Sequence, residues 1–254
     1  MEPTPYCQLV EQAIEDVPVP QYSDEEHGTW KLLLEKQLSL IDEHACSEFT
    51  EGVRRLQFDR ERIPALQDIS TTLKKATGWQ LLRVEGLVHP RDFFALLSRK
   101  LFPSTDFIRQ RADLDYTPAP DMFHDLFGHT PLLTNPEFTT FFEAFGKIGV
   151  NACERYPEGH PIHDQVQRVY WFTVEFGLIN TPRGVRAYGS GSTSSPQELA
   201  FCLSPECRRY PFEIERVSQQ TFDIWHLQED VFVIDSFAQL GQELRNWAAT
   251  HEIL

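Results

Sequence analysis

Two histidines stand five positions apart in the segment PDMFHDLFGHTP (residues 120–131), and their side chains could do chemistry. An imidazole can bind a transition metal, move protons near neutral pH, or simply pack in a core. On an ideal α-helix, side chains five positions apart diverge by about 140°, whereas the zinc motif HExxH places its histidines four apart on one face. His124 and His129 alone therefore leave a metal site, an acid–base pair and packed histidines all open.

The residues around this pair predict a short helix that ends between the two histidines. Pro120 suits a first helical turn, and Asp121 favours the positive end of the helix dipole. Gly128 suits the position just past a helix end, and a proline three residues later prevents the helix from continuing. We expect the first histidine on this helix and the second just after it, where a chain reversal can bring the two imidazoles together.

A carboxylate in an apolar segment strengthens the metal-site interpretation. Glu175 lies in the middle of VYWFTVEFGLI (residues 169–179), where an unpaired carboxylate would cost several kcal/mol. It must be protonated, pair with an arginine such as Arg168 or Arg186, or bind a metal. Two imidazoles with one carboxylate form the facial triad of non-haem Fe(II) oxygenases, and zinc hydrolases use the same His2Glu set. The residue types therefore leave the metal undecided.

Aromatic residues are abundant near these candidate ligands. The chain contains 19 Phe, 7 Tyr and 5 Trp. Most aromatic side chains belong to a core, but a few could line a flat pocket for an aromatic substrate or cofactor. Those close in sequence to the candidate ligands are Phe123, Phe127, Tyr170, Trp171, Phe172 and Phe176.

The elements that must position these residues are mostly helices. Ser23 and Glu26 form a capping-box pattern, and apolar residues recur at helical spacing after them. We expect one domain of mainly α class with short β-strands (α+β), preceded by a loose arm over residues 1–20. The expected helices span 24–44, 47–56, 64–76, 90–100, 135–149, 163–180, 195–204 and 236–250, the expected strands span 79–86 and 184–191, and 221–235 is expected to form a hairpin.

Composition excludes several classes of function. The chain has 254 residues and a formal net charge of −15, which disfavours nucleic acid and anionic membranes as partners because both need a positive face. No segment approaches the roughly 20 apolar residues of a membrane span, and no basic, apolar leader begins the chain. The five cysteines form no CxxC pair and indicate free thiols in a reducing compartment, so we expect a cytoplasmic protein.

Three segments together resemble the pterin-dependent aromatic amino acid hydroxylases, and most of all the short bacterial phenylalanine 4-hydroxylases. They are YTPAPDMFHDLFGHTPLL, YWFTVEFGL and AYGSGSTSSPQEL, and the similarity runs from about Tyr22 to about Tyr210. The specific feature is HxxxxHxPL followed, 46 residues after its second histidine, by a glutamate inside YWFTVEFGL. The resemblance implies that His124, His129 and Glu175 bind iron.

The resemblance also implies the substrate site. Arg109 would hold the substrate carboxylate with its planar fork, and Asp113 or Asp115 would orient that arginine. Glu198 would steady a ligand histidine from behind. The complete set of residues implied at the substrate site is Arg109, Thr117, Pro120, Trp171, Ser194 and Glu198.

The pterin site is implied in the segment VEGLVHPRDFF. Phe93 would stack on the pterin ring, the backbones of Gly86 and Val88 would approach its polar edge, and Asp125 would reach it through water. The implied cofactors are Fe(II) and a tetrahydropterin, either tetrahydrobiopterin or a related compound.

The function implied is a phenylalanine 4-monooxygenase that converts L-phenylalanine to L-tyrosine with O2 and the tetrahydropterin. A tyrosine or tryptophan hydroxylase of the same fold is an alternative. A zinc hydrolase that uses the His2Glu set is another, with Asp125 or Glu198 as general base, and a binding module with core histidines is a third. We expect residues 1–254 to form a single catalytic domain, without a regulatory or tetramerisation domain, that exists as a monomer or weak homodimer.

Overall fold

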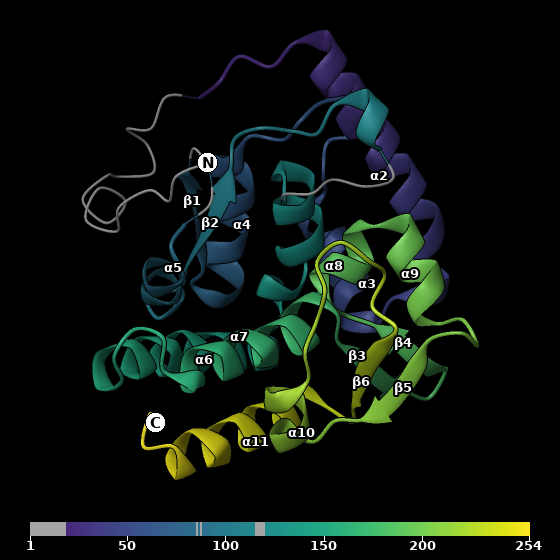
Figure 1. Cartoon of the computed structure of the whole chain (residues 1–254). Helices are drawn as coiled ribbons and strands as arrows, with labels where there is room; N and C mark the ends of the chain where they lie inside the picture. Colours follow the sequence, from purple (N-terminus) through teal and green to yellow (C-terminus); the bar gives the residue numbers. More distant parts are fainter. Residues whose placement is uncertain (1–18, 85, 87, 115–119) are drawn as a thin grey trace.

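The computed structural model describes residues 19–84, 86, 88–114 and 120–254. These residues form a mostly helical body that contains one two-stranded and one four-stranded sheet (Figure 1). This confirms the expected mainly α fold with short strands. The expected loose arm lies, except for its last two residues, outside the described residues.

The first long helix, α2 (Asp24–His44), forms where the sequence predicts it. Its N-terminus is the predicted capping box: the Glu26 N–H donates to Ser23 Oγ at 3.3 Å, and the Glu26 carboxylate accepts from the Ser23 N–H at 2.7 Å. Trp30 and Leu33 belong to the helix face that is buried in the core. Local capping and apolar periodicity thus suffice to predict this element.

The two-stranded sheet lies beside α4 (Leu66–Thr77) and α5 (Pro90–Leu97) (Figure 1). Gly78 ends α4 with a left-handed φ of 84°, which glycine adopts without strain. β1 (Gln80–Val84) pairs in parallel with β2 (Leu101–Thr105), a strand that the sequence did not predict. α5 provides the crossover connection that two parallel strands need.

Three helices form one side of the body: α6 (Pro136–Arg155), α7 (Pro161–Tyr170) and α11 (Phe237–Thr250) (Figure 1). α6 packs against both α5 and α11. A glycine makes the approach to α5 possible, because a Cβ on Gly146 would lie 2.4 Å from the backbone nitrogen of Ser98. The helix starts as predicted, with Asn135 capping its first turn.

The four-stranded sheet has the order β4-β3-β6-β5. β3 (Leu178–Thr181) pairs antiparallel with β4 (Gly184–Ala187) and parallel with β6 (Asp230–Ile234). β5 (Arg208–Pro211) pairs parallel with the other edge of β6. The hairpin predicted over residues 221–235 is therefore wrong, because only β6 is a strand and its partners come from elsewhere in the chain.

The helix predicted over residues 163–180 is also wrong at its end. Helical structure stops at Glu175, and the chain turns at Gly177 into β3. Gly177 permits a very close contact, since a Cβ there would lie 2.1 Å from the ring of Tyr188. A continuous apolar run has no period that separates a buried helix from a buried strand, which is why the sequence did not show this break.

The core is one contiguous cluster that joins the helices to the four-stranded sheet, with a small second cluster beside β1. None of the helices in the described part of the chain is long and apolar enough to cross a membrane. The remaining elements are α3 (Ser47–Leu56), η2 (Arg111–Asp113), η3 (His124–His129), η4 (Leu132–Thr134), η5 (Trp171–Glu175), α8 (Ser190–Ser194), α9 (Pro196–Cys202) and α10 (Ile214–Gln219).

Candidate metal centre

His124 and His129 lie on one short π-helix, η3. The prediction that the helix ends before the second histidine is wrong, because the backbone stays helical through Gly128 to Thr130. A π-helix closes its hydrogen bonds between residues five apart, so it brings side chains at positions i and i+5 to one face. The spacing that an α-helix would spread apart therefore places the two Nε2 atoms 3.1 Å from each other.

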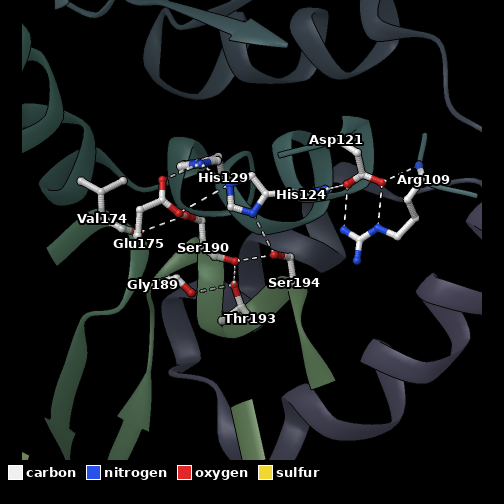
Figure 2. Close-up of polar contacts among 10 residues, drawn as sticks. All are labelled: Arg109, Asp121, His124, His129, Val174, Glu175, Gly189, Ser190, Thr193 and Ser194. Atoms are coloured by element: carbon white, nitrogen blue, oxygen red, sulfur yellow. Dashed lines mark hydrogen bonds and ion pairs between the residues drawn. The ribbon is translucent and has the colours of Figure 1, made fainter. Parts of the chain in front are cut away.

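Glu175 reaches the same point from a second π-helix, η5, which continues α7. Its Oε1 lies 3.3 Å from His129 Nε2, and its Oε2 lies 3.5 Å from His124 Nε2. Figure 2 shows the three side chains converging between the two π-helices. Segments that are 46 residues apart in the chain thus supply one set of donors.

The arginine alternative for Glu175 is not supported in the described part of the chain. Arg168 donates to the carbonyl of Ser218 at 3.3 Å, and Arg186 donates to the carbonyl of Val185 at 2.8 Å. Among the described residues, the ion-pair partners of the Glu175 carboxylate are the two histidines. The partner of Glu175 is therefore the histidine pair or an ion bound by all three residues.

The donor set fits a divalent transition metal. His124, His129 and Glu175 each offer one ligand atom to a common centre. The two Nε2 atoms lie 3.1 Å apart, and Glu175 Oε1 lies 3.3 Å from His129 Nε2. These distances are close to the separation of about 3 Å between two ligands at right angles that each lie about 2.1 Å from a metal. Two imidazoles and one carboxylate on one side are typical of non-haem Fe(II), and zinc accepts the same donors.

α8 lies directly against both π-helices, and glycines make this approach possible. A Cβ on Gly128 would lie 2.8 Å from the carbonyl oxygen of Ser190, and a Cβ on Gly189 would lie 2.3 Å from the carbonyl oxygen of Glu175. At this distance Ser190 Oγ donates to Glu175 Oε2 at 2.7 Å (Figure 2). The small residues of AYGSGS thus allow a hydroxyl to hold the carboxylate, a contact that the sequence did not predict.

Ser194 sets the tautomer of His124. Its hydroxyl donates to the carbonyl of Ser190 at 2.7 Å, so Ser194 Oγ can only accept from His124 Nδ1, which lies 2.9 Å away (Figure 2). His124 therefore carries its proton on Nδ1, and the lone pair of Nε2 is free for a metal. Metal-binding histidines are commonly held in this way by a partner on the other ring nitrogen.

The electrostatics of the centre favour the metal-binding protonation states. Burial lowers the pKa of His124 to about 4, although the Glu175 carboxylate acts in the opposite direction. Burial alone would raise the pKa of Glu175, but His129 and His124 beside it outweigh burial and hold this pKa at about 2. At neutral pH the centre therefore offers a neutral His124 and an ionised carboxylate, which are the forms that bind a metal.

Replacing Ser194 with alanine is expected to weaken iron retention about 10–100-fold, because His124 loses the partner that orients it. The measurement is the rate of iron loss to a chelator, followed by metal analysis. Ser98→Ala is the matched control, since Ser98 bonds only the carbonyl of Ala95 on α5. If Ser194→Ala loses iron at the wild-type rate, Ser194 does not support the ligand.

Arg109, the predicted carboxylate-binding residue, is buried and held by Asp121. Its Nε and Nη2 each donate to one oxygen of Asp121 at 2.8 Å, and its backbone N–H donates to the same carboxylate at 2.9 Å (Figure 2). Burial would raise the pKa of Asp121, but the Arg109 guanidinium outweighs it and lowers this pKa. The orienting acid is thus Asp121, whereas Asp113 is exposed and Asp115 lies outside the described residues.

Asp121 also joins the arginine to the metal centre. Its Oδ1 accepts from the His124 N–H at 3.0 Å, so one carboxylate holds both the guanidinium and the start of the first π-helix. The sequence predicted for Asp121 only a favourable interaction with the helix dipole. An aspartate three positions before the first histidine, at a helix start, is an N-cap pattern that could have indicated this contact.

The residues predicted at the pterin lie around β1 and α5. Phe93 is half-buried on α5, and its ring meets that of Tyr170 edge-on at 5.4 Å. Burial raises the pKa of Tyr170 well above its usual value, and the Glu175 carboxylate raises it further. Gly86 is buried and Val88 is half-buried. The Tyr170 ring thus lies between Phe93 and the candidate metal centre. The roles of Phe93, Gly86 and Val88 in pterin binding stay predictions.

Asp125 is buried and attached to β2. Its Oδ2 accepts from the backbone N–H and the hydroxyl of Thr105, at 2.7 and 3.0 Å. Burial raises its pKa to about 7, against the effect of these hydrogen bonds. One carboxylate oxygen is therefore occupied by protein, and its predicted contact with a pterin through water stays a prediction.

The remaining substrate candidates are Thr117, Pro120 and Trp171. Thr117 lies outside the described residues, and Pro120 is exposed at the start of the segment that leads to the first histidine. Trp171 is half-buried, and its indole stacks on the ring of Phe222 at 4.3 Å. Their substrate contacts stay predictions.

Glu198 is half-buried on α9, and its implied role in steadying a ligand histidine stays a prediction. The contact that holds His124 comes from Ser194, whereas a Glu198 oxygen accepts from the Gln228 backbone N–H at 3.5 Å. Burial raises the pKa of Glu198 to about 7. Its predicted substrate contact stays a prediction, as does that of Ser194.

Comparison with known sequences identifies a family for almost the whole chain. The model of the biopterin-dependent aromatic amino acid hydroxylases matches residues 9–253. The phenylalanine-4-hydroxylase of Chromobacterium violaceum is 44% identical over 88% of this chain and 74% of that protein. The human phenylalanine-4-hydroxylase is 35% identical over 92% of this chain and 51% of that protein.

Solved structures agree with this match. The phenylalanine hydroxylase of Chromobacterium violaceum with bound iron(III) and 7,8-dihydrobiopterin has a TM-score of 0.86 at 39% identity, over 99% of this chain and 93% of that one. The cold-active phenylalanine hydroxylase of Colwellia psychrerythraea has a TM-score of 0.83 at 36% identity, over 92% and 90%.

Proposed function

This chain belongs to the biopterin-dependent aromatic amino acid hydroxylases, and from this premise we propose that it is a phenylalanine 4-monooxygenase. It converts L-phenylalanine to L-tyrosine with dioxygen and a tetrahydropterin at a non-haem Fe(II) centre. The relatives that support this choice of substrate are phenylalanine hydroxylases that are 35–44% identical to it. This membership replaces the zinc-hydrolase and binding-module interpretations.

The observation that carries the proposal is the convergence of His124, His129 and Glu175. Their ligand atoms lie within 4.8 Å of one another, and His124 and Glu175 are in the protonation states that bind a metal. Each of two ligands is held by a hydroxyl of α8, so the set is positioned before any metal arrives. When bound, Fe(II) and a tetrahydropterin supply the chemistry that activates dioxygen toward an aromatic ring.

The protein's own contribution is placement. Arg109 is proposed to bind the carboxylate of phenylalanine, and Asp121 keeps its guanidinium fork in one orientation. Because Asp121 also caps the first π-helix, the substrate anchor and the histidines move as one unit. Phe93 is proposed to stack on the pterin, and the aromatic side chains around it exclude water.

The proposal is tested with purified protein reconstituted with Fe(II), tetrahydrobiopterin and air. We expect tyrosine from phenylalanine, measured by chromatography, and none when iron or pterin is omitted or when zinc replaces iron. Tyrosine and tryptophan serve as competing substrates. Product from one of these, with none from phenylalanine, would correct the substrate, and no product from any of the three would contradict the function.

We also propose that the chain acts as one catalytic domain, as a monomer or weak homodimer, in the cytoplasm. The contiguous core supports a single domain. Among the described residues, the exposed large apolar side chains are few, so no broad apolar face calls for a permanent partner. The cysteines described are free thiols, as in a reducing compartment. Light scattering over a range of concentrations tests the oligomeric state.

A further inference from the structure

The segment of residues 220–229 connects α10 to β6 and contains no helix or strand. Its Phe222 ring stacks on the indole of Trp171 with an interplanar angle of 14°, and Phe176 lies against the same indole at 4.8 Å. The large apolar side chains at its tip, Ile224 and Trp225, are 49% and 62% exposed. Burial of apolar surface at the tip therefore does little to hold this connection in place.

One buried side chain attaches the connection to the second π-helix. Gln228 is only 6% exposed, and its Oε1 accepts from Trp171 Nε1 at 2.9 Å. Its Nε2 donates to the carbonyls of Asp223 and His226, both at 2.8 Å. The orientation of the amide follows from these partners, because a flipped amide would set its oxygen against two carbonyls and its NH2 against the indole N–H.

Trp171 lies close to the metal centre along the chain, since it begins the π-helix η5 that ends at Glu175. The Gln228 backbone N–H also points toward the half-buried carboxylate of Glu198, at 3.5 Å. Gln228 thus connects an exposed segment to the first residue of the helix that carries a candidate ligand.

We propose that Gln228 is a positioning residue for substrate binding, and this rests on the proposed function. The family resemblance places Trp171 on the wall of the substrate pocket. By holding its indole against residues 220–229, Gln228 sets the shape of the aromatic side of that pocket. Its loss loosens both the indole and the connection, so the enzyme binds phenylalanine more weakly and discriminates less between rings of different size. His124 and Glu175 have their own hydroxyl partners on α8, so the variant keeps the metal.

Three variants separate the parts of this contact. Gln228→Leu removes the acceptor and both donors at similar size. Gln228→Glu keeps an acceptor for Trp171 Nε1 but loses the donors to the two carbonyls. Trp171→Phe keeps an aromatic ring and loses only the indole N–H and size. Gln220→Leu is the matched control, since Gln220 lies in the same connection and its side chain reaches only the neighbouring Thr221 carbonyl.

For Gln228→Leu we expect KM for phenylalanine to rise about tenfold while kcat changes less than about threefold, as buried polar groups lose their partners. Iron content stays at the wild-type level, the preference for phenylalanine over tryptophan falls, and chymotrypsin cleaves faster at Trp225. In a double-mutant cycle, the effects of Gln228→Leu and Trp171→Phe on KM are less than additive. Gln228→Glu sets a carboxylate oxygen against the two carbonyls, so we expect it to raise KM at least as much as Gln228→Leu.

The proposal is overturned if Gln228→Leu keeps wild-type KM and ring preference. It is also overturned if the variant only loses thermal stability and iron in parallel, because a purely structural role would do that. The proposed function is judged separately, by whether the wild-type enzyme makes tyrosine. The role of Gln228 is tested by two measurements. They are the proteolysis rate and the ratio of variant to wild-type KM for the amino acid that the enzyme hydroxylates.

Discussion

Glu175→Ala is expected to remove iron retention and hydroxylation together. The variant deletes one of three residues whose ligand atoms lie within 4.8 Å of one another between the two π-helices. Loss of an outer partner of a metal ligand typically costs about 10–100-fold, so loss of a ligand is expected to lower turnover by more than about 100-fold. The measurements are iron per chain by elemental analysis and tyrosine formation at saturating phenylalanine.

A conservative variant and a control variant accompany Glu175→Ala. Glu175→Gln keeps the size of the side chain and an acceptor for Ser190, but it lacks the charge, so we expect intermediate iron retention. Glu154→Ala removes an exposed carboxylate on α6 and is expected to behave as wild type. Tight iron and normal turnover in Glu175→Ala would show that the ligand assignment is wrong.

Arg109→Lys is expected to raise KM for phenylalanine about 30-fold or more at unchanged iron content. The Nε and Nη2 atoms of the guanidinium donate to Asp121, and these two bonds fix the direction in which Nη1 points. A lysine keeps the charge but presents a single point donor and cannot reproduce this geometry. Truncating one partner of a buried, hydrogen-bonded charge pair typically costs about 2–5 kcal/mol, which sets the expected magnitude.

The control for this variant is Arg111→Lys, at an exposed arginine two positions away. Asp121→Asn tests the orienting acid, because it leaves Arg109 in place without a charged partner. We expect it to raise KM as well and to lower the thermal midpoint, since breaking a buried ion pair costs about 3–5 kcal/mol. An unchanged KM in Arg109→Lys would exclude Arg109 as the carboxylate anchor.

Much of the helical framework could be predicted from the sequence because its signals are local. The capping box of Ser23 and Glu26, the cap at Asn135 and the left-handed Gly78 each act over a few residues. Such short-range signals act in the same way in any tertiary environment. The three candidate ligands were named from the resemblance of two motifs to a known family, because the residue types and their spacing alone left other interpretations open.

Strand pairing could not be predicted in the same way. β6 was expected in a hairpin with the residues just before it, yet it pairs in parallel with β3 and β5. The apolar run that contains Glu175 was expected to stay helical, yet it turns into β3 after Gly177. Both outcomes depend on which segments meet across the core, and the sequence of a single strand or helix does not show which segment it packs against.

By itself, then, the sequence determined which residue types are available for chemistry and which helices carry them. The tertiary structure alone decided their geometry. The histidine segment forms a π-helix, in which side chains five positions apart lie on one face, and Asp121 rather than Asp113 is the partner of Arg109. The tertiary structure also brought Ser190, Ser194 and Gln228 to side chains far away in the chain. The physical reason is range: caps and periodicity act within a turn or two, whereas these contacts exist only after α8, the π-helices and residues 220–229 have packed together.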